Sequence, residues 1–456
     1  MPAPHSRSER SELARRYAAV RGQTEALCAP LEIEDYVVQS MPDASPAKWH
    51  LAHTSWFFET LVLKPGLEGY ETLDPSYAYL FNSYYNSLGE QFTRADRGLV
   101  SRPTVAQVQA YRRHVDQAMA RFLEQASDDA VAEAEPVIEV GLHHEQQHQE
   151  LLLTDVKHLF SRNPLAPVYR AASDATAPDG ASAAEVAPLR WHRYTEGLYS
   201  IGHEGADEAF AYDNEGPRHR VFLEEFELAS RLVTCGEWLD FMADGGYERA
   251  ELWLSDGWAT VQAEGWRAPL YWVADDASDD AEGWRCFTLA GMQQVRLSEP
   301  VCHVSFYEAD AFARWVSLRT TGVRLPRESE WEVAACAAGA EAMTHDVALG
   351  TFVDDAAYRP RPLDPRASGD RPAQLFGDVW EWTASPYVAY PGYSPPPGAL
   401  GEYNAKFMSN QLVLRGGSCA TPRSHIRATY RNFFPAPVRW QMTGLRLARD
   451  AHTGDR

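Results

Sequence analysis

Two histidines four residues apart are the part of this sequence whose spacing most directly suggests chemistry. His144 and His148 lie in a segment whose apolar residues recur at helical spacing, so both imidazoles should project from one helix face. Two such nitrogens can bind one metal ion without any rearrangement of the backbone. The stretch His-Glu-Gln-Gln-His at these positions also matches the HExxH pattern of zinc hydrolases, in which Glu145 would activate a metal-bound water.

A third histidine, His53, lies in another predicted helix, among aromatic residues. A helical bundle could bring it to the same point as His144 and His148. Three neutral imidazoles suit Fe, Zn, Cu or Ni and leave positions open for substrate or oxygen. The alternative is that His53 is an ordinary core histidine. His50 and His143 are neighbouring candidates, but only His144 pairs with His148 at four-residue spacing.

Four amphipathic segments in the first part of the chain are expected to position these histidines. They comprise residues 11–28, the helix beginning at 46, residues 105–122 and the segment around 144–148. Such segments predict a four-helix bundle, where metal sites are built from side chains that face inward. Ser45 is expected to cap the second helix, with Pro46 at its first position. The longest connection, residues 82–103, is a candidate functional loop.

The second part of the chain has a different character. Residues 163–188 are rich in Ala, Pro, Ser, Asp and Gly and predict a linker. It separates a first domain, residues 1–162, from a second, residues 189–450. The second has a predicted strand at 221–228, a predicted helix at 306–319, and much Gly, Pro and Trp in irregular order. The chain is therefore expected to be an α+β multidomain protein.

The composition narrows the class of protein. A length of 456 residues indicates two or three domains. An excess of 64 acidic over 42 basic residues argues against nucleic acid as a partner. No apolar run approaches the roughly 20 residues that span a bilayer, and no signal-peptide core is present, so we expect a cytoplasmic protein with no membrane partner. Six cysteines without a CxxC pair indicate reduced thiols.

Two pairs of residues in the 82–103 loop could contribute to a site. Tyr84 and Tyr85 could simply pack against the domain, or could donate a proton beside an oxygen-binding metal. Arg94 and Arg97 could hold a substrate carboxylate in a bidentate grip, or could form a solvated basic turn.

Two adjacent aromatic residues stand out near the end of the chain. Phe433 and Phe434 follow an Arg-rich segment that begins at residue 427. Aromatic faces bind a quaternary ammonium group by cation–π attraction. Packing in the core is the alternative role for both rings.

Both parts of the chain resemble known families. Three stretches resemble the DinB-like iron-binding domain of the ergothioneine-type sulfoxide synthases: residues 45–53, 81–85 and 144–151. Three others are similar to their formylglycine-generating-enzyme-like (sulfatase-modifying-factor) domain, a variant of the C-type lectin fold: residues 377–383, 414–418 and 444–448. The resemblance implies an N-terminal DinB-like four-helix bundle followed by a C-type-lectin-like mixed α/β domain with much irregular structure.

The resemblance also implies a cofactor and a reaction. In that family a mononuclear non-haem Fe(II) is held by three histidines, which correspond here to His53, His144 and His148. The substrates are hercynine (trimethylated histidine), a thiol or its equivalent, and O2. A carbon–chalcogen bond forms on the imidazole ring, and sulfur substrates give a sulfoxide. The chain is thus expected to be an iron-dependent oxidoreductase.

Further site residues are implied by position in the family pattern. One or both of Tyr84 and Tyr85 match active-site tyrosines beside the iron. The positions that surround hercynine correspond to Gln147, Asn432, Phe433 and Phe434. Asp43 and Arg94 match positions near the second substrate. Glu145 would then lie outside the metal's ligands.

The chalcogen donor stays open between two alternatives. Cysteine or γ-glutamylcysteine is the donor of ergothioneine-type synthases, whereas selenoneine synthases, of the same two-domain build, join hercynine to a selenosugar. Residues 86–93 carry no basic residue, which suits a neutral donor, while Arg94 favours a carboxylate. Tyr430 stands where formylglycine-generating enzymes place a second cysteine partner for Cys419, which disfavours copper-dependent cysteine oxidation. Ovothiol synthases of this group carry an additional methyltransferase domain, and no such domain is expected within these 456 residues, which argues against that class.

Three other classes remain as alternatives. A zinc hydrolase would use Glu145 as its base, a DinB-like thiol transferase would need no O2, and a lectin-like binding protein would have no turnover. A structural Ca²⁺ in the second domain is a further open question.

Overall fold

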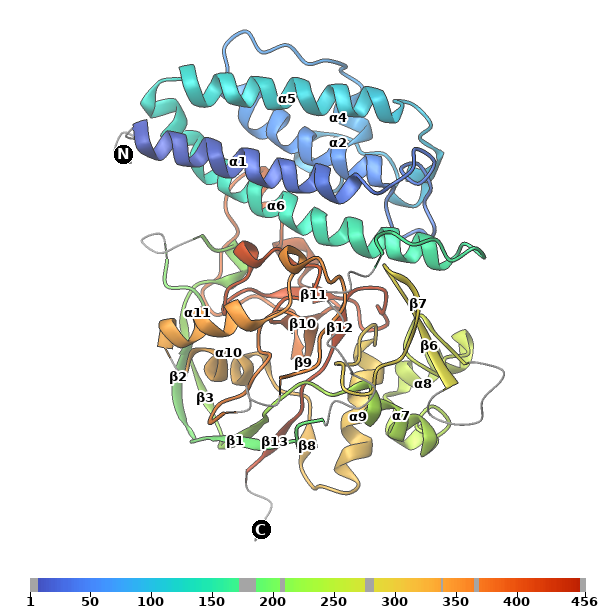
Figure 1. Cartoon of the computed structure of the whole chain (residues 1–456). Helices are drawn as coiled ribbons and strands as arrows, with labels where there is room; N and C mark the ends of the chain where they lie inside the picture. The colour runs from blue at the N-terminus through green and yellow to red at the C-terminus, as the bar shows by residue number, and fades with distance from the viewer. Residues whose placement is uncertain are drawn as a thin grey trace. The chain divides into compact units, whose positions relative to one another are not determined.

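The computed structural model describes residues 7–171, 186–205, 210–274, 283–337, 339–364 and 369–451. Their contacts divide the chain into two compact units (Figure 1). Unit 1 comprises the described residues up to Tyr169 together with Pro396–Tyr403, and unit 2 comprises the other described residues. Residues 172–185 of the predicted linker lie outside the described residues. The domain boundaries drawn from the sequence remain a prediction.

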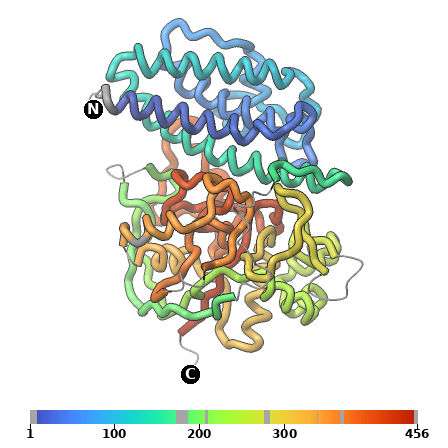
Figure 2. The backbone as a smooth tube through the Cα atoms, viewed as in Figure 1, coloured from blue at the N-terminus to red at the C-terminus, as the bar shows by residue number. Residues whose placement is uncertain are grey.

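Unit 1 is built on four long helices: α1 (Arg7–Cys28), α2 (Ala47–Phe58), α5 (Val105–Gln125) and α6 (Asp128–Ser161). α2 packs against both α5 and α6, and α1 packs against α6. Figure 2 shows these helices running side by side in the blue and teal part of the chain. Every residue of α2 is buried, as expected for a helix enclosed by the other three. The predicted helical first domain is confirmed.

Local sequence explains where these helices begin. Thr104 and Gln107 form a reciprocal capping box at the start of α5, and Ser127 caps α6. The prediction for α2 was wrong in detail. Pro46 itself occupies the N-cap position and no side chain caps the helix. Ser45 has other partners: its backbone N–H donates to Asp155 at 2.8 Å.

Shorter elements connect the long helices of unit 1. A π-helical turn, η1 (Glu59–Leu63), extends α2 and leads into α3 (Lys64–Gly66). The connection to α5 contains α4 (Tyr77–Leu80), η2 (Asn86–Leu88) and η3 (Arg94–Leu99). The predicted 82–103 loop therefore consists of irregular backbone with two 3₁₀ turns.

Unit 2 contains small sheets with helices and long irregular connections, as predicted for a mixed α/β domain. One sheet has the strand order β1-β4-β13-β8, and a second has the order β11-β10-β9-β12, in which only β12 and β9 are parallel. The strands of these two sheets are β1 (Trp191–Tyr194), β4 (Phe226–Ala229), β8 (Val323–Arg324), β9 (Trp380–Pro386), β10 (Leu412–Arg415), β11 (Asn432–Phe434), β12 (Thr443–Gly444) and β13 (Ala448–Asp450).

The remaining elements of unit 2 surround these sheets. Two smaller antiparallel sheets contain β2 (Gly197–Ile201) and β3 (His219–Leu223), and β5 (Trp272–Ala274), β6 (Trp284–Thr288) and β7 (Gly291–Gln294). The helices are α7 (Cys235–Ala243), α8 (Ser255–Glu264), α9 (Phe306–Ser317), α10 (Glu328–Cys336) and α11 (Gly339–Leu349). The predicted helix at 306–319 is thus confirmed as α9.

The predicted single strand at 221–228 was wrong. The chain forms two strands there, β3 and β4, separated by Glu224 and Glu225. β3 pairs with β2, whereas β4 pairs with β1 and β13. The apolar run is divided because its two ends belong to different sheets.

Large aromatic side chains form the core of unit 2. Trp331, Trp380 and Trp382 are each at most 1% exposed. The last two lie in β9 and come from the Gly-Asp-Val-Trp-Glu-Trp-Thr stretch noted in the sequence. Trp382 Nε1 donates to the carbonyl of Val304 at 2.9 Å, which satisfies its buried N–H.

Two expectations from composition can be compared with the structure. None of the six cysteines forms a disulfide, in agreement with the predicted free thiols. Among the helices of the described residues, none is both long and apolar enough to cross a bilayer.

Candidate metal centre

The three predicted histidines come together inside unit 1. His53 projects from α2, and His144 and His148 project from α6. One ring nitrogen from each lies within 4.8 Å of the other two, and the Nε2 atoms of His53 and His144 are 3.1 Å apart. Nitrogens that bind one metal ion at about 2.1 Å lie roughly 3 Å from each other. The donor set therefore matches a metal ion that is held from two helices.

Aromatic rings hold the first of these imidazoles in place. His53 lies between Trp49, at a ring distance of 4.5 Å, and Trp56, at 5.7 Å, with both planes nearly parallel to its own. The ring of His144 lies 4.8 Å from that of Phe57. All three histidines are at most 8% exposed. This packing limits rotation of the rings and keeps water away from them.

The hydrogen bonds of the histidines indicate which nitrogen is presented. His53 Nδ1 lies 2.6 Å from the carbonyl oxygen of Phe81, which can only accept, so Nδ1 donates and Nε2 is the nitrogen left to bind a metal. His148 Nδ1 lies 2.8 Å from Nδ1 of His50. His144 Nδ1 is buried and has no hydrogen-bond partner among the described residues.

Burial keeps these imidazoles neutral, which is the form that binds metals. Desolvation lowers the pKa of His53 and His148 well below the usual value, and it lowers the pKa of His144 to about 3. The proximity of the other imidazoles lowers the pKa values of His53 and His148 further. The centre is therefore ready to accept a cation at neutral pH.

The metal-free protein should lose stability in mild acid because of these groups. Their folded-state pKa values lie below the unfolded value of about 6.5, so the unfolded chain binds protons first as the pH falls. We expect the free energy of unfolding to be insensitive to these histidines above about pH 6.5 and to decrease from there downward. Urea titrations between pH 8 and pH 5 measure this. A His144→Gln variant should show a shallower decrease, and equal slopes would contradict the assignment.

Glu145 does not face the metal centre. Its carboxylate accepts hydrogen bonds from Arg112 at 2.6 Å, from Arg21 at 2.8 Å and from Thr24 at 2.7 Å, and the residue is fully buried. Burial alone would raise its pKa, but the two guanidinium groups hold it at about 2. The carboxylate is thus part of an ion-pair network that joins the helices. This arrangement does not match the zinc-hydrolase interpretation, in which Glu145 activates water.

The predicted tyrosines and Gln147 lie near the histidines, together with a residue that was not predicted. Tyr84 and Tyr85 stack on each other at 4.7 Å. Tyr403 lies 5.7 Å from the ring of His144 and 6.3 Å from that of Tyr84. Its hydroxyl donates a short hydrogen bond to Oε1 of Gln147. This bond fixes the orientation of the glutamine amide.

Tyr403 reaches the centre because a short segment from the second part of the sequence belongs to unit 1. In that segment, Pro396–Tyr403, the carboxylate of Glu402 accepts the backbone N–H groups of Asn86 and Ser87, both at 2.9 Å. These residues directly follow the tyrosine pair. No sequence signal pointed to Tyr403, which lies 256 residues from Gln147.

The two loop arginines have different environments. The guanidinium of Arg94 is exposed and donates to the backbone carbonyl of Asp43, so the two residues predicted near the second substrate are indeed neighbours. Arg97 is buried, lies 3.4 Å over the ring of Trp49 and donates to Ser45 Oγ at 2.9 Å. Arg97 is therefore part of the packing around the histidines, and Arg94 is the member of the pair that faces solvent.

The remaining predicted residues lie in unit 2, on β11. Phe433 stacks on Tyr387 at 4.0 Å, while Asn432 and Phe434 project from the opposite face of the strand because side chains alternate. The side chain of Phe434 is half-buried on this face. Their place beside a substrate stays a prediction.

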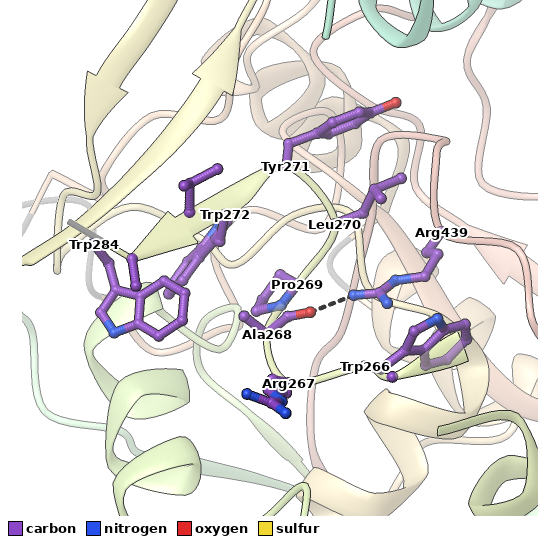
Figure 3. Close-up of a pocket in the computed structure, with 12 residues that line it drawn as sticks. Trp266, Arg267, Ala268, Pro269, Leu270, Tyr271, Trp272, Trp284 and Arg439 are labelled. Carbon is purple, nitrogen blue, oxygen red and sulfur yellow. Dashed lines mark hydrogen bonds between the residues drawn. The ribbon is translucent and has the colours of Figure 1, made fainter. Parts of the chain in front are cut away.

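A pocket of about 400 Å³ also lies in unit 2 (Figure 3). Its lining includes Trp266, Trp272, Trp284 and Arg439. Figure 3 shows Arg439 beside Trp266, over whose ring it lies at 4.1 Å. None of the predicted site residues lines this pocket, so it is separate from the residues discussed above.

Comparison with known proteins places both parts of the chain. Residues 16–152 match the family model of the DinB superfamily. Residues 194–361 and 372–451 match that of the sulfatase-modifying factor enzyme 1-like domain. The predicted combination of a DinB-like and a formylglycine-generating-enzyme-like domain is thereby confirmed.

Among the curated relatives, hercynine oxygenases match nearly the whole chain, and a fungal protein matches about half of it. A hercynine oxygenase of Mycobacterium tuberculosis is 31% identical over 90% of this chain and 92% of its own length. A hercynine oxygenase of Mycolicibacterium thermoresistibile is 31% identical over 97% of this chain and 95% of its own. The ergothioneine biosynthesis protein 1 of Schizosaccharomyces pombe is 26% identical over 54% of this chain and 29% of its own. Because two hercynine oxygenases are 31% identical to this chain across both domains, the chain belongs to the hercynine oxygenase family.

Proposed function

We propose that this chain is a non-haem Fe(II), O2-dependent synthase that forms a carbon–chalcogen bond on the imidazole of hercynine. The observation that carries the proposal is the buried cluster of His53, His144 and His148, with nitrogens at metal-ligand spacing. Membership of the hercynine oxygenase family supports hercynine as the substrate.

Iron is the metal best suited to this reaction. Three neutral imidazoles bind Fe(II) and leave open positions, and the bound ion would supply the binding and reduction of O2. With a thiol donor, the ring C–H and the S–H bonds break and a C–S bond forms. One oxygen atom goes to sulfur and the other leaves as water, which balances the four electrons that O2 accepts.

Residues at the positions implied by the family pattern would bind and orient hercynine. We assign to the amide of Gln147, which precedes His148 and is hydrogen-bonded by Tyr403, a hydrogen bond to the substrate. We assign the trimethylammonium group to the aromatic face of Phe434, by cation–π attraction, with Asn432 beside it on the same face of β11. Phe433 would support them through its stack on Tyr387.

One of the two loop tyrosines would act as a proton donor. Tyr84 is half-buried and Tyr85 fully buried, and both belong to the loop that is held by Glu402. A phenol held beside the metal can donate its proton to oxygen as that oxygen is reduced. We therefore assign this role to Tyr84 or Tyr85.

One observation favours the alternative donor, a selenosugar. Of the paired loop arginines Arg94 and Arg97, Arg97 already contacts Trp49 and Ser45. Arg94 is then the arginine of this pair that could bind a donor carboxylate. The carboxylate of cysteine or γ-glutamylcysteine would therefore be held by one of these arginines instead of two. A neutral sugar that carries selenium needs no such grip. Cysteine-type donors and a selenosugar are thus both candidates.

A competition experiment tests the reaction and the donor together. The protein is purified without oxygen, loaded with Fe(II), and given hercynine, O2 and equal amounts of cysteine, γ-glutamylcysteine and a selenosugar. Mass spectrometry identifies the products. We expect a hercynine adduct of one donor, formed only with Fe(II) and O2. A preference of orders of magnitude for a thiol would eliminate the selenosugar, and the reverse would eliminate the thiols.

Two controls separate the other reaction classes. Loading with Zn(II) instead of Fe(II) should give no adduct, and peptide cleavage or an adduct with zinc alone would overturn the iron assignment. Oxygen uptake should accompany turnover mole for mole. An adduct that forms under strict anaerobiosis would indicate a thiol transferase instead.

A further inference from the structure

A fourth buried histidine, His50, lies within hydrogen-bond distance of His148, one of the three candidate metal ligands. His50 is one turn before His53 on α2 and is only 2% exposed. Its Nδ1 is 2.8 Å from Nδ1 of His148, and its Nε2 is 3.1 Å from Oδ2 of Asp155. Asp155 lies two turns after His148 on α6 and is 7% exposed. The three side chains form a continuous buried chain of hydrogen bonds.

With His50 neutral, the protons in this chain have one arrangement that satisfies every contact. The carboxylate of Asp155 can only accept, so His50 donates to it from Nε2. Nδ1 of a neutral His50 is then an acceptor, and His148 must donate from its own Nδ1. That leaves Nε2 of His148 as the nitrogen with a lone pair for a metal.

The other two histidines lack such support. His53 donates to the neutral carbonyl of Phe81, and His144 Nδ1 has no hydrogen-bond partner in the described part of the chain. His148 is therefore the ligand that is linked, through a second imidazole, to a negative charge. Hydrogen bonding of a metal ligand to a carboxylate fixes its tautomer and raises its basicity.

We propose that His50 and Asp155 are positioning residues that hold His148 as an Nε2 ligand and increase its electron donation to the metal. The inference rests on the proposed iron site and deepens it. Asp155 is itself oriented by the backbone N–H of Ser45, which donates to the same Oδ2 at 2.8 Å. The chain of contacts thus joins Ser45, which lies just before the N-cap residue of α2, to the metal centre.

Metal affinity, measured without substrates, tests this role. The full-length protein is titrated with Co(II) against a chromophoric chelator, and the visible absorption of bound Co(II) is recorded. We expect His50→Leu to weaken binding by roughly 10- to 100-fold and to change the Co(II) spectrum. Asp155→Asn should act in the same direction. The double variant should bind about as weakly as His50→Leu alone, because both residues act through one chain.

Matched variants distinguish this role from a general effect on folding. His158 lies on the same helix one turn after Asp155 and contacts Ser40 at 2.7 Å, so His158→Leu should keep the parent affinity. His50→Gln, whose amide can both accept and donate, should recover much of the affinity lost in His50→Leu, including where the leucine variant folds poorly. Thermal unfolding of each metal-free variant reports on the fold separately.

The outcomes separate this inference from the proposed function. Parent affinity and spectrum in His50→Leu, or additive losses in the double variant, would overturn the inference. A parent protein that binds Co(II) tightly but does not convert hercynine would overturn the proposed function alone. A parent that binds no divalent metal would overturn both.

Discussion

Replacing His144 with alanine is expected to abolish metal binding and turnover together. His144 supplies one of the three clustered nitrogens, and loss of a direct ligand should exceed the roughly 10- to 100-fold effect of losing an outer hydrogen-bond partner. Its Nδ1 makes no hydrogen bond with any described residue, so the substitution breaks no other polar contact of the ring. Iron content after anaerobic loading and product formation from hercynine measure the two effects.

The adjacent histidine provides a matched control for this experiment. His143 is also buried in α6 but does not belong to the metal cluster. His143→Gln should retain iron and most of the turnover. A variant series in which His143→Gln loses the metal while His144→Ala keeps it would refute the assigned ligand set.

The helices and the metal ligands were predictable from sequence because their signals are local. The spacing of His144 and His148 follows from the helical repeat, and aromatic neighbours marked His53 as a residue of the bundle interior. Thr104 and Ser127 cap α5 and α6 through backbone N–H groups three residues further on, although Ser45 was the residue predicted as a cap. Such features depend on residues within one or two turns of each other.

Contacts between distant residues were not predictable in the same way. Tyr403 has no motif around it, and its place in unit 1 depends on the contact of Glu402 with Ser87 and on its own hydrogen bond to Gln147. The spacing of His148 and Asp155 on one helix face could have indicated a second role for that face, but the partner, His50, comes from another helix. The split of the 221–228 run was hidden because strand pairing is decided by residues far along the chain.

The HExxH match shows how one local pattern can indicate the correct kind of site and the wrong role for a residue. A helix places positions 144 and 148 on one face and position 145 about 100° away from the first. In this bundle that direction points to Arg21 and Arg112, between α1, α5 and α6. The same helical geometry that brings the histidines together therefore directs Glu145 to a different set of partners.

Replacing Glu145 is accordingly expected to destabilise unit 1 rather than to stop a hydrolytic step. Glu145→Gln would leave the charges of Arg21 and Arg112 buried without their carboxylate, which typically costs about 3–5 kcal/mol. The free energy of unfolding, from urea titrations followed by the fluorescence and helical signal of the full chain, measures the loss. Turnover per folded, iron-loaded molecule should remain close to that of the parent, whereas a zinc hydrolase would lose its activity and keep its stability.

The pH dependence gives this prediction a second readout. The folded-state pKa of Glu145, about 2, lies below the unfolded value of about 4.5, so its contribution to stability is complete above pH 4.5 and is lost as the pH falls toward 2. The difference in stability between the parent and Glu145→Gln should therefore shrink in that range. Glu139→Gln is the matched control, because its partner Arg16 is 40% exposed and such pairs contribute at most about 1 kcal/mol. Equal losses of stability in the two variants would show that the buried network stabilises the bundle no more than this partly exposed ion pair does.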